Sequence, residues 1–546
     1  MRRHSPTVAV MLRTCALLGA AVLLVGCTDR PDLADRAPDL GDPERCAEAV
    51  TALVAELQEH VDAYAAVSAE AFLAGDPDRL PAPADEVIVE GLEVVAGLGC
   101  DPETVDRHLR TGIGGLTADG PIREAVVAEL RVQLLDGAPP QPWERELTPA
   151  DDLARVLAAA PDGSALTLTA GTHRPSEPLR ATRELTLSGS GADETRVVVE
   201  GGDSALVVDA PAPVEVADLT IKHEASATAA VVQVATPTVE LHDVRVTGGA
   251  ADDQGAGGAG ILIGVAFPGP VPGDPDDLDA ATPTLRDVEV VDNHGAGILV
   301  TDNAAPRIVG AAVRDNGSCG ICYLEAAAGT VTGATIAGNT TGLAISQDAR
   351  PTATEIHLAD NVQDGVIVDG DSAPRLDDLE VVDNGRHGVL VTDAATVELA
   401  GASFGGNGGF GLAVGEEATA DLADLEVDGH EVGLWVEEEA RATLSGGGLA
   451  ATGGDDVVGI VVEDADLVAD GTAISGYELG LELREDARAE LTGVVISETG
   501  EAAVVARDRS MLTGADTSCE DNPFDVVLFD EAANELDGDG CTATQG

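Results

Sequence analysis

The sequence predicts an all-β solenoid preceded by a small all-α domain. A four-residue unit that begins with glycine, represented by Gly297-Ile-Leu-Val300, returns at steps of 21 to 26 residues through the second half of the chain. Fixed self-similarity at this period is typical of stacked repeats. Each repeat holds two short runs rich in Val, Ile and Leu, bounded by Gly, Asn, Asp or Pro. This pattern indicates strands rather than helices.

Asparagine recurs shortly before most of the repeat glycines. Asn and Gly tolerate the left-handed backbone of a sharp turn, and stacked Asn amides can hydrogen-bond from one coil to the next. The column consists of Asn293, Asn316, Asn339, Asn361, Asn384 and Asn407. We therefore expect a ladder of turn asparagines along the solenoid.

Alternation along the repeated strand separates inward from outward side chains. Residues one and three positions after each glycine, such as Val366 and Val368, are predicted to stack inside the coil. The residue between them faces outward, and this column is apolar over nine rungs. Its members are Leu262, Leu299, Cys322, Ala344, Ile367, Leu390, Ala413, Trp435 and Val461.

The outward apolar column supplies the candidate binding residues. Contiguous apolar patches usually mark an interface, which makes Ile367, Leu390 and Trp435 candidates for contact with the helical domain or with an envelope partner. Trp435 is the expected anchor. The alternative is that aliphatic residues suit exposed strands without any partner.

This repeat pattern resembles the right-handed parallel β-helix family, the superfamily of pectate lyases and related sugar-acting or sugar-binding proteins. The resemblance covers roughly residues 149–530, enough for about sixteen coils. The segment around Gly171-Thr-His-Arg174 is similar to the turn that precedes the first complete coil in that family. The resemblance implies a fold and leaves the reaction open.

Residues 1–26 form a targeting segment, with Arg2-Arg3 before a long apolar run. Its end, Leu24-Val25-Gly26-Cys27, resembles the lipobox of bacterial lipoproteins. That resemblance implies acylation of Cys27 and a lipid anchor in the cell envelope. Thr28 in place of aspartate favours the outer membrane. The alternative is a plain transmembrane anchor.

The remaining segments follow from composition and helical periodicity. The predicted order is a flexible tether at 27–43, a helical domain at 44–136, a Pro-rich linker at 137–148, the solenoid at 149–530 and an acidic tail at 531–546. Within the solenoid, Asp151 to Ala159 is expected to form a helix that covers the first coil. Val265 to Asp279 is expected to loop out of an enlarged coil.

Six cysteines remain outside the leader and the lipid position, which suits an oxidising compartment. Cys46 and Cys100 lie at ends of two helices that meet in an antiparallel hairpin, so we expect them to pair. Cys519 and Cys541 are expected to attach the tail to the last coil. For Cys319-Gly-Ile-Cys322, a local disulfide and two reduced, packed thiols both remain open.

The net charge of −68, with a single lysine, limits the partners. Nucleic acid is excluded, because phosphate binding needs a basic footprint. Polyanionic polysaccharides are repelled unless a divalent cation bridges them. The simplest interpretation of the acidity is that it keeps a surface protein soluble.

No catalytic, metal or cofactor site is predicted. The segments that polygalacturonase-like β-helices use are missing from this chain, the basic residues that pectate-lyase-like sites need are scarce and scattered, and no nucleophile elbow is present. Arg386-His387 is interpreted as a satisfied surface pair. Asp274, Asp276, Asp277 and Asp279 could hold Ca²⁺, but their spacing is not that of an EF-hand loop and solvated loop carboxylates are the commoner explanation.

The sequence therefore predicts a lipid-anchored envelope protein whose solenoid binds a glycan or an envelope protein, or acts as a scaffold. The alternative function is an enzyme that acts on an uncharged or cationic polysaccharide. The shortage of exposed aromatic side chains counts against that alternative, since sugar-binding grooves commonly use them as platforms.

Overall fold

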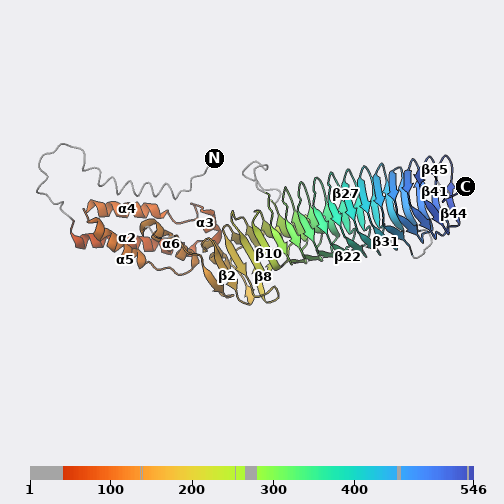
Figure 1. The fold of residues 1–546 in the computed structure, drawn as a ribbon. Helices are drawn as coiled ribbons and strands as arrows, with labels where there is room; N and C mark the ends of the chain where they lie inside the picture. Colours follow the sequence, from red (N-terminus) through yellow and green to blue (C-terminus); the bar gives the residue numbers. More distant parts are fainter. Residues whose placement is uncertain are drawn as a thin grey trace, which may run out of the picture. The chain divides into compact units, whose positions relative to one another are not determined.

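The computed structural model describes residues 41–135, 137, 139–252, 254–264, 280–451, 457–537 and 540–545. The chain divides into two compact units, Met1–Pro142 with Ala158–Pro161 and Trp143–Leu157 with Asp162–Gly546. The first unit is helical, and the second is a β-solenoid (Figure 1).

The helices of the first unit form the predicted helical domain. Its elements are α2 (Pro43–Ala63), η1 (Tyr64–Ala66), α3 (Ala69–Ala74), α4 (Ala84–Gly97), α5 (Pro102–Gly114) and α6 (Pro121–Leu135). Asp101 is the N-cap of α5 and accepts a hydrogen bond from the Thr104 N–H at 3.0 Å. The predicted disulfide between Cys46 and Cys100 is present. Among the described residues, no helix is long and apolar enough to cross a membrane.

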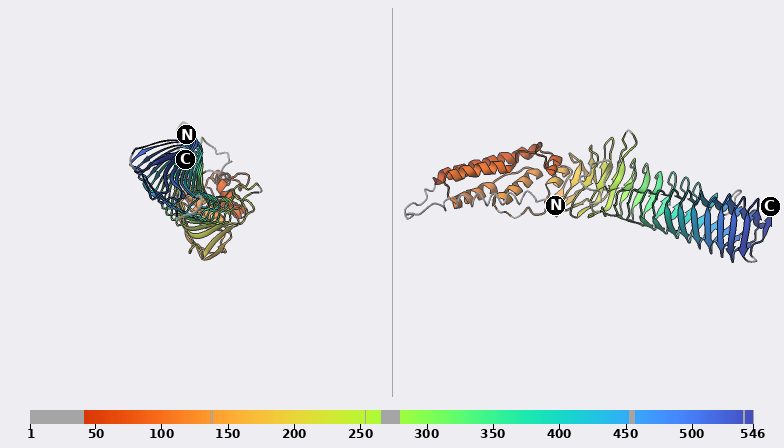
Figure 2. Two further views of the ribbon diagram at one scale, coloured as in Figure 1. Left: turned by 90° about the vertical axis from the view of Figure 1, so that its right-hand side faces the viewer. Right: turned by 90° about the horizontal axis from the view of Figure 1, so that it is seen from above.

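The second unit stacks parallel strands into about sixteen coils (Figure 2). One sheet has sixteen strands and contributes one strand to each coil. The other sheet has thirty strands, arranged as two ladders that join through the long strands β8 and β10. This arrangement confirms the predicted fold class.

The strands of the sixteen-stranded sheet are β4 (Leu179–Ala181), β7 (Leu206–Val208), β9 (Ala230–Val234), β11 (Ala259–Ile263), β14 (Ile298–Val300), β17 (Cys319–Tyr323), β20 (Thr341–Ile345), β23 (Val366–Val368), β26 (Val389–Val391), β29 (Leu412–Val414), β32 (Val432–Glu437), β35 (Val458–Glu463), β38 (Leu479–Arg484), β41 (Ala502–Ala506), β44 (Phe524–Leu528) and β46 (Ala543–Gln545).

The thirty-stranded sheet comprises β1 (Glu144–Leu147), β2 (Ser164–Leu168), β3 (Gly171–His173), β5 (Leu185–Ser188), β6 (Thr195–Val199), β8 (Val214–His223), β10 (Val239–Thr247), β12 (Thr284–Arg286), β13 (Glu289–Val291), β15 (Arg307–Val309), β16 (Ala312–Arg314), β18 (Thr330–Thr332), β19 (Thr335–Ala337), β21 (Thr352–Thr354), β22 (His357–Ala359), β24 (Arg375–Asp377), β25 (Glu380–Val382), β27 (Thr396–Ala400), β28 (Ser403–Gly405), β30 (Thr419–Ala423), β31 (Glu426–Asp428), β33 (Arg441–Ser445), β34 (Gly448–Ala450), β36 (Asp466–Asp470), β37 (Ala473–Ser475), β39 (Arg488–Thr492), β40 (Val495–Ser497), β42 (Met511–Ala515), β43 (Ser518–Glu520) and β45 (Ala533–Asp537).

The core of the solenoid is formed by the predicted inward columns. The residue one position after each repeat glycine, from Ile298 to Leu481, is at most 3% exposed. The residue three positions after, from Val300 to Leu483, is 0% exposed. Each fully buried Val, Leu or Ile contributes about 1.5–3 kcal/mol before the entropic cost of ordering. Stacking of these two buried apolar columns from one coil to the next therefore stabilises the solenoid.

The asparagine ladder runs inside the coil at a turn. The Asn361 N–H and Nδ2 both donate to Oδ1 of Asn384, at 3.1 and 2.8 Å. The same pattern links consecutive asparagines from Asn293 to Asn407. At the next rung, Asn407 donates to Nε2 of the buried His430 at 3.0 Å, and burial lowers the pKa of His430. The neutral imidazole thus continues the ladder as an acceptor.

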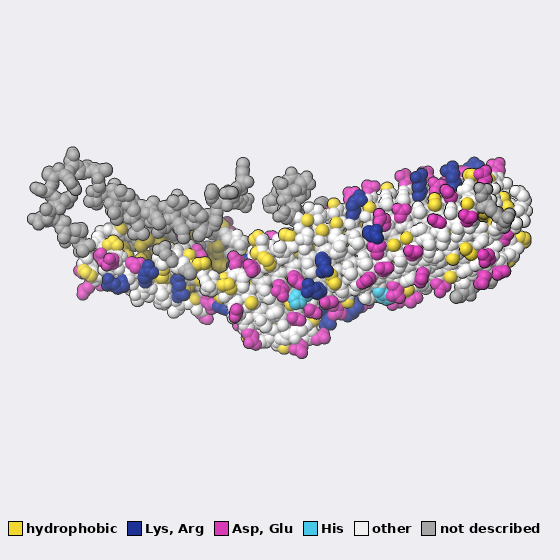
Figure 3. All heavy atoms as spheres, in the orientation of Figure 1, with side chains coloured by type: hydrophobic (Ala, Val, Ile, Leu, Met, Phe, Trp, Pro, Cys, Tyr) yellow, Lys and Arg dark blue, Asp and Glu magenta, His cyan; other side chains and the backbone are white. Residues whose placement is uncertain are grey.

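The turns explain part of the acidity of the chain. All 24 described non-glycine residues with positive φ are Asp, Glu or Gln. Asp tolerates this backbone better than most L-residues. Neighbouring rungs also use these side chains: the Gly370 N–H donates to Asp393 and the Asp393 N–H donates to Glu416, both at 3.0 Å. Carboxylates are spread along the visible solenoid face (Figure 3), and many have this structural role beside any effect on solubility.

Both ends of the solenoid extend beyond the predicted limits. Glu144–Leu147, placed by the sequence in the linker, pairs with β2 as strand β1. Residues 531–546, interpreted as an acidic tail, contain β45 and β46, which pair with β42 and β44. The Cys519–Cys541 disulfide holds this last segment, as expected. The end coils lack the glycine-centred unit, so the repeat pattern did not reveal them.

Helix α7 (Leu153–Ala159) lies between β1 and β2 in the chain, where a covering helix was expected. Its Leu153 and Leu157 are buried. The expected loop at 265–279, with its four aspartates, and the lipidation candidate Cys27 lie outside the described residues.

Candidate binding face on the sixteen-stranded sheet

The predicted outward column forms one continuous file across the sixteen-stranded sheet. Ile367 pairs in register with Leu390, Leu390 with Ala413, and Ala413 with Trp435. Ile367, Leu390 and Trp435 are half-buried, while the flanking inward residues are fully buried. The column is not exposed along its whole length as predicted, because Leu262, Cys322, Ala413 and Val461 are at most 5% exposed. The three candidate residues therefore share one outward face, and their role in binding remains a prediction.

The N-terminal part of this file is a compact apolar patch. Leu262 and Cys322 are buried there together with four small residues, and Leu299 and Ala344 pack against them. A disulfide joins Cys319 to Cys322, which selects one of the two states that the sequence left open. Leu262 and Cys322 are each only 4% exposed, so this part of the column, predicted to face outward, offers little surface to a ligand.

Aromatic rings stack along the middle of the face. The ring of His387 lies 4.9 Å from that of Phe410, and Phe410 stacks on Trp435 at 4.9 Å with an interplanar angle of 12°. The Arg484 guanidinium lies 5.8 Å from the centre of the Trp435 ring. The ring faces therefore contact one another from rung to rung, and ring edges are left for a ligand.

A buried carboxylate anchors the start of the aromatic stack. The Asp364 side chain is 0% exposed and pairs with Nε and Nη2 of Arg386, the Nε–Oδ1 distance being 2.9 Å. Asp364 also accepts the His387 N–H at 3.1 Å. This hydrogen bonding raises the pKa of Arg386. Burial lowers the pKa of His387, and Arg386 lowers it further while Asp364 opposes both.

Sequence reasoning missed this cluster. Arg386-His387 was interpreted as a satisfied surface pair, which holds for Arg386 because Asp364 from the preceding coil neutralises it. The detectable signal was positional: Asp364, His387 and Phe410 each directly precede a repeat glycine. That column was not followed from coil to coil, because its members differ in chemistry.

Charged side chains continue the face beyond Trp435. The Glu482 side chain is only 7% exposed and lies between Arg484 at 2.7 Å and Arg507 at 3.2 Å. Glu437 pairs in register with Glu463 on the next strand. Burial raises the pKa of Glu437, and the neighbouring carboxylates of Glu438 and Glu463 raise it further. The face thus offers donors and acceptors on both sides of the stack.

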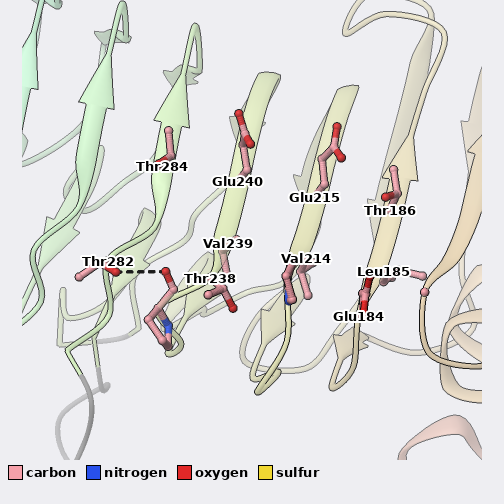
Figure 4. A pocket seen from close by; sticks show the side chains of 13 residues that line it. Glu184, Leu185, Thr186, Val214, Glu215, Thr238, Val239, Glu240, Thr282 and Thr284 are labelled. Carbon is pink, nitrogen blue, oxygen red and sulfur yellow. Dashed lines mark hydrogen bonds between the residues drawn. The ribbon is translucent and has the colours of Figure 1, made fainter.

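A separate hollow lies on the thirty-stranded sheet (Figure 4). It has a volume of about 410 Å³ and is crossed by Thr186, Glu215, Glu240 and Thr284, which pair in register on β5, β8, β10 and β12.

Two of the three carboxylates that line the hollow already have partners. Glu215 bonds His242 at 3.1 Å, and Glu240 pairs with Arg286 at 2.8 Å. Burial alone would lower the pKa of His242, but hydrogen bonds to Glu215 and Asp243 outweigh it and raise that pKa. With Glu215 and Glu240 paired and no aromatic ring in its lining, the hollow is the weaker candidate.

No metal site emerges from the described part of the chain. Within those residues, no group of three His, Cys, Asp or Glu side chains is placed to hold an ion.

Comparison with known proteins supports the fold. Residues 278–427 match a family model described as "Right handed beta helix region". The chain thus carries a right-handed parallel β-helix, and the predicted resemblance to that family is confirmed. No curated protein matches the chain.

Three solved structures illustrate the similarity. The enzymatically active domain of bacteriophage CBA120 tailspike protein 2 is 13% identical with a TM-score of 0.38, covering 55% of this chain and 47% of its own. The periplasmic alginate epimerase AlgG is 11% identical with a TM-score of 0.36, covering 72% and 84%. A GH87 α-1,3-glucanase from Streptomyces thermodiastaticus is 14% identical with a TM-score of 0.35, covering 74% and 69%. The chain spans about half the length of the tailspike domain, and similarity at this level carries no argument about activity.

Proposed function

We propose that the protein is a lipid-anchored envelope protein that binds a polysaccharide along the outward face of the sixteen-stranded sheet. The observation that carries the proposal is the continuous file through Ile367, Leu390 and Trp435. Rungs about 4.8 Å apart make such a file a linear surface, which matches an extended chain of sugars better than a rounded small molecule.

The chemistry of the file suits a polyhydroxylated ligand. Apolar side chains and ring edges can contact the C–H groups of sugars, while Arg386, Glu437 and Arg484 border the file with donors and acceptors. Because the whole chain carries a charge of −68, a neutral or cationic polymer is favoured over a polyanion. An envelope protein on the same face, or a scaffold without a ligand, is the competing outcome.

Trp435→Ala and Leu390→Asp should each weaken retention on a bound polysaccharide at least about tenfold, corresponding to roughly 1.4 kcal/mol. The soluble chain from Thr28 onward is run through affinity gels containing a neutral glucan, chitosan or pectate. The melting temperature of both variants should stay within a few degrees of the parent, because the changed side chains are half-buried.

Val468→Asp is the matched control for Leu390→Asp. Val468 is an outward strand residue of the other sheet, 43% exposed, and its substitution should leave retention unchanged. Equal retention of the two aspartate variants would refute the proposed face. Failure of the parent chain to be retarded by any of the polymers would refute polysaccharide binding itself.

Cys27→Ser should abolish lipid attachment and leave a precursor that keeps its leader, because the thiol is the proposed acylation site. The measurement is incorporation of labelled palmitate together with the mass of the mature chain. Cys15→Ser, inside the leader, is the control and should be labelled like the parent. Equal labelling of the Cys27 variant would contradict the anchor.

An enzyme that acts on polysaccharides is the second candidate function. The specific observation is that Glu437 lies opposite Glu463 in register beside Trp435, with the pKa of Glu437 raised by burial. Glycoside hydrolysis requires a protonated carboxylic acid and a second, ionised carboxylate. Release of reducing ends in the same incubations, abolished by Glu437→Gln, would favour this function over binding alone.

A further inference from the structure

We propose that Arg386, His387 and Phe410 form a preorganised subsite for a neutral sugar unit, with Asp364 as its positioning residue. The inference rests on the proposed polysaccharide binding and specifies where the face recognises its ligand and which chemistry it selects. It assigns recognition to a cluster of two donor side chains and one ring at the start of the aromatic stack.

The Arg386 guanidinium is held in one orientation. Asp364 from the preceding coil bonds Nε and Nη2 as a fork, and its carboxylate is 0% exposed. Two parallel hydrogen bonds to one carboxylate fix the orientation of a guanidinium group far better than a single contact does. The Arg386 side chain is nevertheless 48% exposed, and no described residue bonds its Nη1. A guanidinium fixed on one edge and open on the other is placed to donate to a ligand.

The His387 imidazole is fixed in one neutral tautomer. Its Nδ1 accepts the Phe410 backbone N–H at 3.1 Å, so the ring proton of the neutral form is on Nε2. Among the described residues Nε2 has no hydrogen-bond partner, and it is not one of the buried unpartnered nitrogens, so it reaches solvent. His387 therefore offers a second oriented donor beside Arg386.

Phe410 completes the subsite from the next coil. Its ring lies between those of His387 and Trp435, each centroid 4.9 Å away. The stack and the Phe410 N–H hydrogen bond together orient the imidazole, and the stack places an apolar ring beside His387. Sugar recognition needs this combination of donors for hydroxyl oxygens and apolar surface for C–H groups.

The local charge selects a neutral ligand. Asp364 neutralises Arg386, and His387 is uncharged at neutral pH because burial lowers its pKa. The two donors therefore present hydrogen bonds without net positive charge. Hydroxyl and ring oxygens of a neutral sugar satisfy them, whereas a uronate carboxylate would meet no uncompensated cation on a strongly acidic chain.

The test is affinity electrophoresis of the chain from Thr28 onward against a neutral glucan, chitosan and pectate. Arg386→Lys and His387→Ala should each weaken retention on the neutral glucan about tenfold, since a lysine cannot reproduce the fork and alanine removes the second donor. Asp364→Asn should weaken glucan retention and increase pectate retention. The substitution removes the carboxylate that neutralises Arg386 and so leaves a net positive charge at the subsite.

Arg375→Lys is the matched control. Arg375 also bonds a neighbouring carboxylate through Nε and Nη2, at Asp377, but lies on the thirty-stranded sheet. Its substitution should change no retention. His387→Gln, which keeps a donor, should recover part of the affinity lost in His387→Ala and so separates recognition from folding.

The outcomes distinguish this inference from the function on which it rests. Loss of glucan retention in Trp435→Ala but not in Arg386→Lys or His387→Ala would overturn the subsite and leave polysaccharide binding intact. Retention of pectate or chitosan alone by the parent chain would overturn the selection of a neutral sugar. No retention of any polymer would overturn both.

Discussion

Val368→Asp should lower the free energy of unfolding by about 3–5 kcal/mol, the range expected for an uncompensated buried charge. Val368 is 0% exposed, and its register partners Ile345 and Val391 are equally buried. A carboxylate at this position leaves water and finds an aliphatic column on both sides. Guanidinium chloride unfolding followed by circular dichroism measures the change.

The pH dependence of the Val368→Asp variant has a defined sign. Burial raises the pKa of the introduced carboxyl above about 3.9, its unfolded value. The folded state then binds a proton more readily than the unfolded state, so the penalty is greatest at neutral pH and shrinks as the pH falls through the raised pKa. The destabilisation relative to the parent chain should therefore be smaller at pH 4 than at pH 7.

Ile367→Asp is the internal control for the same strand. Ile367 is adjacent in sequence but faces outward and is half-buried, so its substitution should cost about 1 kcal/mol or less. Equal destabilisation by the two aspartates would show that the assignment of inward and outward columns is wrong.

The fold was predictable because its signal is repeated over nine successive coils, from Gly297 to Gly480. Glycine, the two inward residues and the turn asparagine recur with the same spacing, so an error at one coil is corrected by its neighbours. The end strands β1 and β45 were missed for the converse reason: each contacts a solenoid coil on one side only and carries no repeat signature.

The candidate site was predictable only in part. Ile367, Leu390 and Trp435 lie in one repeat column, and alternation alone places them on one face. The fork between Asp364 and Arg386 and the stack of His387 on Phe410 join residues 22 and 23 positions apart. These contacts depend on side-chain direction across rungs, which periodicity does not specify.

Asn361→Ala should lower the free energy of unfolding by about 3 kcal/mol or more. The Asn361 side chain donates to Ile336 O at 3.2 Å and to Asn384 Oδ1 at 2.8 Å. Its Oδ1 accepts from the N–H and Nδ2 of Asn339, at 3.1 and 3.2 Å. Truncation leaves several buried polar groups without partners, and each such group costs about 1–3 kcal/mol.

Two further variants separate the ladder from simple packing. Val362→Ala changes the next residue, which is 69% exposed, and should alter stability by about 0.5 kcal/mol or less. Asn361→Asp keeps the acceptors but removes the donors and directs a charge at Asn384 Oδ1, so it should be at least as harmful as alanine. An alanine variant that loses no more than about 1 kcal/mol would mean that water or backbone shifts satisfy the freed groups. The ladder would then set the register of the coils without contributing to their stability.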